Sequence, residues 1–352
     1  MPIKKITISE FVNLSELHPV IDVRSPGEFQ HAHFPNAHNI PLFTDEERKE
    51  VGIAYKQVGK QKAIKIGLDY FGPRMKSNIE EVEKIFKQLR SNSKTIIVHC
   101  WRGGMRSAGM AWLFDLYGFE VYIVVGGYKA FRTWTIKQFE LPYYIKVIGG
   151  YTGSSKTELL HEIKNNKEPI IDLEGIALHK GSAFGGIGLP EQPTQEMFEN
   201  ILAVELSKMN QNEKSISFWI EDESQRIGRL NIPNPLWKTI RAAPLFFIDI
   251  DFETRLDFIL NYYGKLDKQA LINAILRIQK RFGPNETKMT INHILENNIK
   301  EAFRILLQYY DKTYFKSLQN REELKSQMKK ITLTSTDATT NYQLLQQFIN
   351  QQ

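Results

Sequence analysis

The sequence predicts an α/β fold in two domains, each built on a parallel sheet. Short apolar runs alternate with longer stretches of helical periodicity along most of the chain. Several of the apolar runs end in polar or glycine-rich turns, which is where α/β proteins place their functional groups. The chain has 352 residues, more than one hydrophobic core usually organises. Two α/β domains are therefore expected.

The first domain is expected over residues 1–138. Its three clearest strands are apolar and brief, with helices predicted between them. The strands are expected at Val20–Val23, Thr95–His99 and Val121–Val125. Helical periodicity fades over residues 133–143, so we place the domain boundary near Glu140.

The second domain, residues 139–352, is expected to resume the alternation and to include a helical block at about 253–327. Its strands are expected at Tyr144–Ile148, Pro169–Leu173, Ser215–Ile220, Leu245–Asp249 and Lys330–Thr334. Within the block, helices are predicted over residues 267–281 and 299–310, with a break at Gly283 and Pro284 between them.

Composition narrows the class of protein. The formal net charge is +6 and the pI is about 9.0, which suits a polyanionic partner such as RNA. No apolar run is long enough to span a bilayer, and the start of the chain lacks the apolar segment of a signal peptide. We therefore expect a cytoplasmic protein without a membrane partner. The single cysteine excludes an internal disulfide and a cysteine-rich zinc site.

That cysteine, Cys100, follows a predicted strand and opens a short loop that leads into a helix. The start of a helix offers unpaired N–H groups and a partial positive charge, and Arg102 and Arg106 add formal charge. A thiolate is the species that these groups stabilise. Cys100, Arg102 and Arg106 are therefore the predicted catalytic residues, with Cys100 as a nucleophile or a carrier of sulfur or selenium. The alternative is a buried structural thiol.

The Cys100 loop and its surroundings resemble the rhodanese family. The resemblance rests on residues 100–107, on Ile21–Phe29, on His33–Pro41 and on Val125–Tyr128. It implies a rhodanese-like first domain. Arg106 lies six positions after Cys100, whereas most rhodanese loops place this arginine at five. The longer spacing is shared with phosphatases of rhodanese-like fold, so a cysteine-dependent phosphatase remains the alternative.

A second glycine-rich turn, at residues 149–157, joins the strand that ends near Ile148 to a helix predicted over Glu158–Ile163. This is the arrangement of a P-loop, in which backbone N–H groups and a lysine bind phosphate. Ser155 stands where the P-loop pattern has its second glycine, which leaves ATP hydrolysis open. The predicted phosphate-binding residues are Gly150, Thr152, Gly153, Ser154, Ser155, Lys156 and Thr157.

Acidic residues follow two strands of the second domain and could complete this site. Such residues could hold Mg²⁺ or a water molecule, or they could be solvated turns or helix N-caps. The candidates are Asp172, Glu174, Glu221, Asp222 and Glu223. We assign no metal site with them. A glycine-rich segment, His179–Gly186, could close over a ligand or be an ordinary surface connection.

The two loops in one chain resemble the tRNA 2-selenouridine synthase family. The motifs that carry the resemblance are residues 100–107, 150–157, 172–175 with 179–185, and 221–224. Membership implies a transferase that replaces the 2-thio sulfur of the tRNA wobble uridine with selenium. The implied co-substrates are selenophosphate and geranyl diphosphate, which forms an S-geranyl intermediate. An enzyme that supplies selenophosphate is an implied partner.

The resemblance also implies a division of labour. Cys100 would carry selenium, and the Lys156 loop would hold the diphosphate of the prenyl donor. Trp219, Phe246 and Phe247 are candidates for the apolar trough that a geranyl tail needs, although such residues are more often core. Residues 277–281, rich in Arg and Lys, are a candidate tRNA contact or a solvated helical face. A third possible function is a nucleotide-dependent kinase or regulatory module that carries a passive rhodanese domain.

Overall fold

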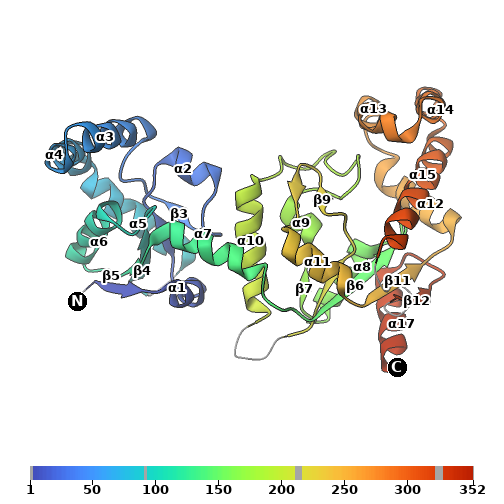
Figure 1. The fold of residues 1–352 in the computed structure, drawn as a ribbon, viewed down its shortest axis with the longest axis horizontal. Helices are drawn as coiled ribbons and strands as arrows, with labels where there is room; N and C mark the ends of the chain where they lie inside the picture. Colours follow the sequence, from blue (N-terminus) through green and yellow to red (C-terminus); the bar gives the residue numbers. More distant parts are fainter. Residues whose placement is uncertain (1–2, 91–92, 211–215, 322–327, 352) are drawn as a thin grey trace. The chain divides into compact units, whose positions relative to one another are not determined.

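The computed structural model describes residues 3–90, 93–210, 216–321 and 328–351, and it confirms the α/β class. These residues divide into two compact units (Figure 1). The first contains the chain up to Gln138 together with Glu199–Val204, and the second contains Phe139–Phe198 and the chain from Glu205 onward. No helix in the described part of the chain is long and apolar enough to cross a membrane.

The first unit has a parallel sheet with the strand order β1-β5-β4-β2-β3. Its strands are β1 Lys4–Ile6, β2 Val20–Asp22, β3 His38–Asn39, β4 Thr95–His99 and β5 Glu120–Val124. β4 is central and completely buried, because Ile97 pairs with Val20 on one side and with Tyr122 on the other. The carboxyl end of β4 therefore opens in the middle of the sheet, where the Cys100 loop begins.

Helices complete the first unit. They are α1 Ile8–Leu14, α2 Pro26–His31, α3 Asp45–Gln57, α4 Lys60–Phe71, the 3₁₀ turn η1 Gly72–Arg74, α5 Met75–Leu89, α6 Met105–Tyr117 and α7 Gly127–Gln138. α6 ends at Gly118, whose φ of +106° gives the left-handed cap expected of a glycine there. Helical periodicity was expected to fade from residue 133, but α7 continues as a helix to Gln138.

The second unit has its own parallel sheet, in the order β12-β11-β6-β8-β7. The strands are β6 Ile145–Gly150, β7 Ile170–Ile171, β8 Phe218–Glu221, β11 Leu245–Asp249 and β12 Met328–Thr332. β11 has the predicted bounds. β7 is shorter than predicted because Asp172 caps the next helix, and Ser215 lies outside the described residues. A short antiparallel pair, β9 Arg226–Ile227 and β10 Leu230–Asn231, lies beyond β8.

The helices after Gln138 follow the second sheet or form the helical block. They are α8 Lys156–Asn165, α9 Leu173–Ala177, α10 Gln195–Lys208, α11 Asn234–Ala242, α12 Phe252–Tyr263, α13 Lys268–Phe282, α14 Pro284–Leu295, α15 Ile299–Gln319 and α17 Ala338–Asn350. Residues 199–204, in the middle of α10, are the part of this helix that belongs to the first unit. In the block, α14 packs against both α13 and α15, and α15 packs against α12 (Figure 1). Gly283, at the predicted break, has a φ of +106° and separates α13 from α14.

Candidate functional site

The Cys100 loop connects β4 to α6 and is held in place by the start of α7. The N–H of Tyr128 donates to the carbonyl of Cys100, and the N–H of Lys129 donates to that of Trp101, each at 2.9 Å. Gly127, with a φ of +58°, allows this approach, because an added Cβ would lie 2.3 Å from the Cys100 carbonyl oxygen. The loop is therefore fixed by backbone contacts at its first residues.

The sulfur of Cys100 is buried among hydrogen-bond donors. It lies 3.3 Å from the Ser107 hydroxyl oxygen, and the residue is only 3% exposed. Burial alone would raise the pKa of the thiol, but hydrogen bonds to the sulfur together outweigh it. They involve the Ser107 side chain and backbone and the backbone N–H groups of Arg102 and Gly104, and the pKa of Cys100 lies below its ordinary value. The loop thus favours a thiolate.

The two arginine side chains of this loop have different surroundings. Arg106, in the first turn of α6, donates to the Glu28 carboxylate at 2.7 Å. Glu28 in turn caps α2 through the backbone N–H of Ser25. Arg102 is exposed at the loop surface. The structure therefore places Ser107 beside the sulfur, a contact that the sequence analysis did not predict. It pairs Arg106 with Glu28.

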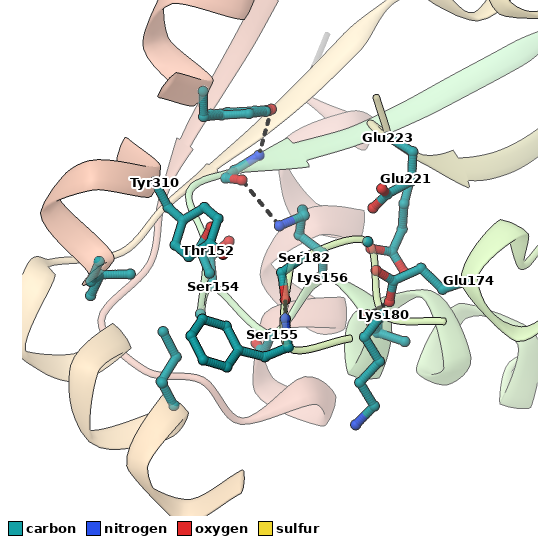
Figure 2. Close-up of a pocket in the computed structure, with 18 of the residues that line it drawn as sticks. Thr152, Ser154, Ser155, Lys156, Glu174, Lys180, Ser182, Glu221, Glu223 and Tyr310 are labelled. Atoms are coloured by element: carbon teal, nitrogen blue, oxygen red, sulfur yellow. Dashed lines mark hydrogen bonds between the residues drawn. The ribbon is translucent and has the colours of Figure 1, made fainter. Parts of the chain in front are cut away.

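The second glycine-rich loop lies between β6 and α8, as a P-loop requires. Gly150 and Gly153 have φ values of +152° and +83°, and Ser155 has a φ of +51° at the start of the helix. Lys156 Nζ donates to the carbonyl of Gly150 at 3.1 Å, so the lysine side chain lies back over the loop (Figure 2). All seven predicted phosphate-binding residues line one cavity of about 360 Å³.

Two buried networks from the helical block hold this loop. Arg255 of α12 donates to the Thr152 carbonyl at 2.9 Å and forms a bidentate ion pair with Asp311 of α15, at 2.8 and 3.0 Å. Tyr314 of α15 accepts from the Gly150 N–H at 3.1 Å and donates to Asp222 at 2.8 Å. The phosphate loop therefore takes its shape partly from helices more than a hundred residues further along the chain.

Three carboxyl groups lie on one side of the loop (Figure 2). Glu174, Glu221 and Glu223 line the cavity with Lys156. Burial, then repulsion between neighbouring carboxylates, raises the pKa of each to about 8, while Lys156 opposes the shift. One oxygen of the buried Glu221 has no hydrogen-bond partner in the described part of the chain. An anionic ligand here needs protons or a cation among these groups.

The other two acidic candidates have structural partners. Asp172 lies outside the cavity lining and caps α9 by accepting from the Gly175 N–H at 2.8 Å, which is the N-cap alternative. Asp222 lines the cavity but accepts from Tyr314 and lies 3.3 Å from Arg321. Among the described residues, no group of three or more His, Cys, Asp or Glu side chains is arranged to hold a metal ion.

The opposite side of the cavity is apolar and comes from the helical block. Its lining residues there are Phe258, Ile259, Tyr262 and Tyr263 of α12, and Phe303, Leu306, Leu307 and Tyr310 of α15. Phe184, from the glycine-rich segment after α9, joins Tyr263 and Phe303 in ring contacts at centroid distances of 5.9 to 6.2 Å. The cavity thus has a phosphate loop at one side and an aromatic and aliphatic wall at the other.

The candidates Trp219, Phe246 and Phe247 for an apolar trough are wrong, because all three lie outside the cavity lining. Trp219 and Phe246 pack against each other at 4.9 Å in the core beneath α8 and α17. On α15 the lining residues recur at helical spacing from Phe303 to Tyr314. That pattern is visible in the sequence, but it is equally typical of a helix that packs in a core.

The glycine-rich segment expected at His179–Gly186 lies at the cavity. Lys180, Gly181, Ser182 and Phe184 line it. An added Cβ on Gly181, whose φ is +61°, would come within 2.9 Å of the Glu174 and Glu223 carboxylates. The segment therefore covers the acidic side with backbone and contributes Phe184 to the apolar wall.

An α/β domain with an activated cysteine, in one chain with a phosphate-loop domain, defines a class of two-domain enzymes with separate nucleophile and phosphate sites. Family models agree: residues 7–133 match the rhodanese-like domain, and residues 144–335 match the tRNA 2-selenouridine synthase AAA domain. The chain belongs to the tRNA 2-selenouridine synthase family.

Individual relatives support this assignment over most of the chain. A tRNA 2-selenouridine synthase of Nitrosomonas europaea is 36% identical over 289 residues, 81% of this chain and 73% of the relative. One of Sulfurovum sp. is 34% identical, covering 84% of this chain and 87% of its own. One of Hydrogenovibrio crunogenus is 33% identical over 95% of both chains.

Proposed function

We propose that this protein is a transferase that converts 2-thiouridine at the tRNA wobble position to 2-selenouridine. It would use geranyl diphosphate to alkylate the sulfur and selenophosphate to supply selenium. The observation that carries the proposal is the two-sided cavity of the second unit. A phosphate loop facing an apolar wall suits a ligand with an anionic head and a hydrocarbon tail better than it suits a phosphomonoester.

In the first step the thiocarbonyl sulfur attacks C1 of the geranyl chain. The S–C bond forms as the C1–O bond breaks, the diphosphate leaves with the electron pair, and the N3 proton of the base passes to water. Backbone N–H groups of residues 150–157 and the Lys156 ammonium would stabilise the charge on the departing diphosphate. The wall of α12 and α15 would hold the tail and exclude water from the reacting carbon.

Magnesium fits the acidic side of this site. The Thr157 hydroxyl, 3.3 Å from Glu174, and the unpartnered oxygen of Glu221 are the hard oxygen donors that Mg²⁺ prefers. Mg²⁺, when bound, would neutralise diphosphate charge. These carboxyls do not form a closed protein cage, which agrees with a cation that takes several of its ligands from phosphate and water.

In the second step selenium displaces the alkylated sulfur at C2 of the base. S-geranyl-2-thiouridine, selenophosphate and water would give 2-selenouridine, geranylthiol and phosphate, with no change of oxidation state. The Cys100 thiolate, which its buried and hydrogen-bonded setting favours, is the proposed nucleophile at C2. Its S–C bond would form as the C2–S bond of geranylthiolate breaks, and selenium freed from selenophosphate by water would then form the C2–Se bond as the Cys100 S–C bond breaks. Selenium bound directly to Cys100 would be a selenopersulfide, whose formation from selenophosphate needs a two-electron oxidant, so Cys100 acts here as a nucleophile.

The tRNA would meet exposed basic side chains. Arg277, Lys280 and Arg281 of α13 are exposed, although Arg277 also donates to the Ala183 carbonyl at 3.4 Å. Contact with phosphates there would weaken as salt is raised. An enzyme that makes selenophosphate, and a cytoplasmic setting where both act, follow from the same proposal.

The test is mass analysis of nucleosides from 2-thiouridine tRNA after incubation with the protein, geranyl diphosphate, Mg²⁺ and selenophosphate. Wild type should yield geranylated and then selenated nucleoside. Cys100→Ala should abolish selenation and leave geranylation within about twofold, and Cys100→Ser controls for side-chain size. Absence of both products would sink the proposal. Hydrolysis of an aryl phosphate that depends on Cys100 would instead favour the cysteine-dependent phosphatase.

A further inference from the structure

Two residues that line the cavity carry a buried hydroxyl proton with no acceptor among the described residues. They are Ser155 and Tyr310, and the phenolic oxygen of Tyr310 accepts from the backbone N–H of Ala183. Buried hydroxyls are normally paired, and an unpaired one costs about 1–3 kcal/mol. Ser155 belongs to the phosphate loop and Tyr310 to the apolar wall, and both line the same cavity. The two groups are therefore candidates for direct contact with a ligand.

Ser155 combines two unfavourable features. It adopts a left-handed φ of +51°, a region that costs a residue with a side chain about 1–2 kcal/mol. The residue is also only 3% exposed, and its hydroxyl has no hydrogen-bond partner in the described part of the chain. Neighbouring hydroxyls are used within the loop: Ser154 donates to the Tyr151 carbonyl at 2.7 Å, and Thr157 lies 3.3 Å from Glu174. A glycine would avoid both costs, so the hydroxyl needs another reason to be present.

Tyr310 reaches the same loop from α15, one turn before Tyr314. Figure 2 shows its ring directed toward Thr152 and Ser154, on the side of the loop opposite the carboxyl groups. The Tyr314 hydroxyl donates a hydrogen bond to Asp222, whereas the Tyr310 hydroxyl has no acceptor for its proton in the described part of the chain. Burial raises the pKa of Tyr310 above its ordinary value, although the backbone N–H of Ala183 opposes the shift. The phenol therefore stays protonated, and its own proton is available to donate.

We propose that the hydroxyls of Ser155 and Tyr310 donate hydrogen bonds to the diphosphate of the prenyl donor and stabilise it as it leaves. The inference rests on the proposed function and adds two donors to the backbone cradle. As the C1–O bond breaks, its electron pair passes to the bridging oxygen, and the charge on the diphosphate rises. Donors placed at the junction with the apolar wall meet that charge where it develops.

The first experiment measures geranylation kinetics for Ser155→Ala, Ser155→Gly and Tyr310→Phe. Each change removes a hydroxyl, and Ser155→Gly also removes the left-handed strain. Each variant is expected to lose about 10- to 100-fold in kcat with a smaller rise in the KM for geranyl diphosphate, because the contact strengthens as the bond breaks. If the serine matters only through backbone shape, Ser155→Gly will be at least as active as wild type, and the inference fails.

The second experiment measures binding of inorganic diphosphate by calorimetry, with no tRNA or prenyl group. Ser155→Ala and Tyr310→Phe should each weaken binding about 10- to 100-fold, the loss of about one hydrogen bond to a charged group. Thr290→Val is the matched control, since Thr290 of α14 also carries a buried, unpartnered hydroxyl but lies outside the cavity. It should bind diphosphate as wild type does.

The outcomes separate the inference from the proposed function. If both hydroxyls contribute to diphosphate binding but the wild-type protein never alkylates tRNA, the inference about the two donors stands and the proposed function is wrong. If the wild-type protein alkylates tRNA and the Ser155→Ala and Tyr310→Phe variants have unchanged kcat and diphosphate affinity, the proposed function stands and the inference about the two donors is wrong. Equal melting temperatures of the variants exclude loss of fold as the cause of a deficit.

Discussion

The two anion-binding loops of this protein are built in different ways. The Cys100 loop is fixed by residues that follow it closely in sequence: Ser107 contacts its sulfur, and Tyr128 and Lys129 hold its backbone. The phosphate loop at residues 149–157 is held by Arg255, Asp311 and Tyr314, which belong to the distant helical block. The first loop stabilises one buried atom. The second opens on a cavity that the same block completes.

This difference indicates why the helical block is part of the site. A thiolate needs a few donors within one turn of a helix, and a local segment can supply them. A ligand with a charged head and an apolar tail needs two unlike surfaces at a fixed separation. α12 and α15 provide the second surface and tie it to the first through Arg255 and Tyr314. Predictions can therefore be made for each loop separately.

The largest expected effect is on the phosphate loop alone. Lys156→Ala should lower geranylation about 100- to 1000-fold, because an ammonium near the leaving group is lost. Alkylation of Cys100 by iodoacetamide should not change. Lys164→Ala, an exposed change on the same helix α8, is the control. Loss of Cys100 reactivity in Lys156→Ala would show that the two loops are not independent.

A smaller effect is expected when the support from the helical block is cut. Asp311→Ala leaves the buried Arg255 without its ion-pair partner, which should destabilise the protein by about 3–5 kcal/mol and raise the KM for geranyl diphosphate. Asp257→Ala removes a solvent-exposed pair between the same two helices, α12 and α15, in which Asp257 contacts Lys300, and should cost at most about 1 kcal/mol. Denaturant unfolding measures both. Equal costs would mean that the buried pair does not hold the loop.

The acidic side of the cavity predicts a pH dependence. The folded pKa of Glu223 is about 8 against an ordinary 4.5, as for Glu174 and Glu221. The folded chain therefore binds more protons than the unfolded chain between these values, and its stability falls as pH rises from about 4.5 to about 8. Glu223→Gln should flatten this slope in denaturant unfolding, whereas the exposed Glu296→Gln should not.

The effect of Mg²⁺ on diphosphate binding tests the same three carboxyl groups, Glu174, Glu221 and Glu223. In its absence, affinity for inorganic diphosphate should fall as pH rises past about 8, because the carboxyls ionise beside an anion. Added Mg²⁺ should restore binding. Calorimetry at several pH values tests this, and affinity that is independent of both pH and Mg²⁺ would contradict it.

The smallest expected effect concerns the Cys100 loop. Ser107→Ala removes the hydroxyl nearest the sulfur and should raise the pKa of Cys100, slowing its alkylation at neutral pH about three- to tenfold. Ser77→Ala, at an exposed serine of α5, serves as the control. An unchanged rate would mean that backbone N–H groups alone set the thiol pKa.

Much of this organisation could be predicted from local pattern. The strands at Thr95–His99 and Leu245–Asp249 were predicted to the residue because each is a short apolar run between polar turns. The apolar wall of the cavity could not be predicted in this way, because lining residues such as Phe303 and Leu306 have the same spacing as core residues. Trp219 was misplaced for that reason: its size suits a ligand trough and a core equally.

The sequence by itself determined the α/β class, both anion-binding loops and the family, because glycines, a lysine and a cysteine at short spacing encode local backbone geometry. Only the tertiary structure decided which side chains act on those loops. It directed Arg106 to Glu28, placed Ser107 at the sulfur and brought Tyr310 and Ser155 to one cavity. Glu28 and Arg106, like Ser155 and Tyr310, lie far apart in the chain, and the direction of the Ser107 hydroxyl depends on the loop conformation. Spacing alone specifies neither.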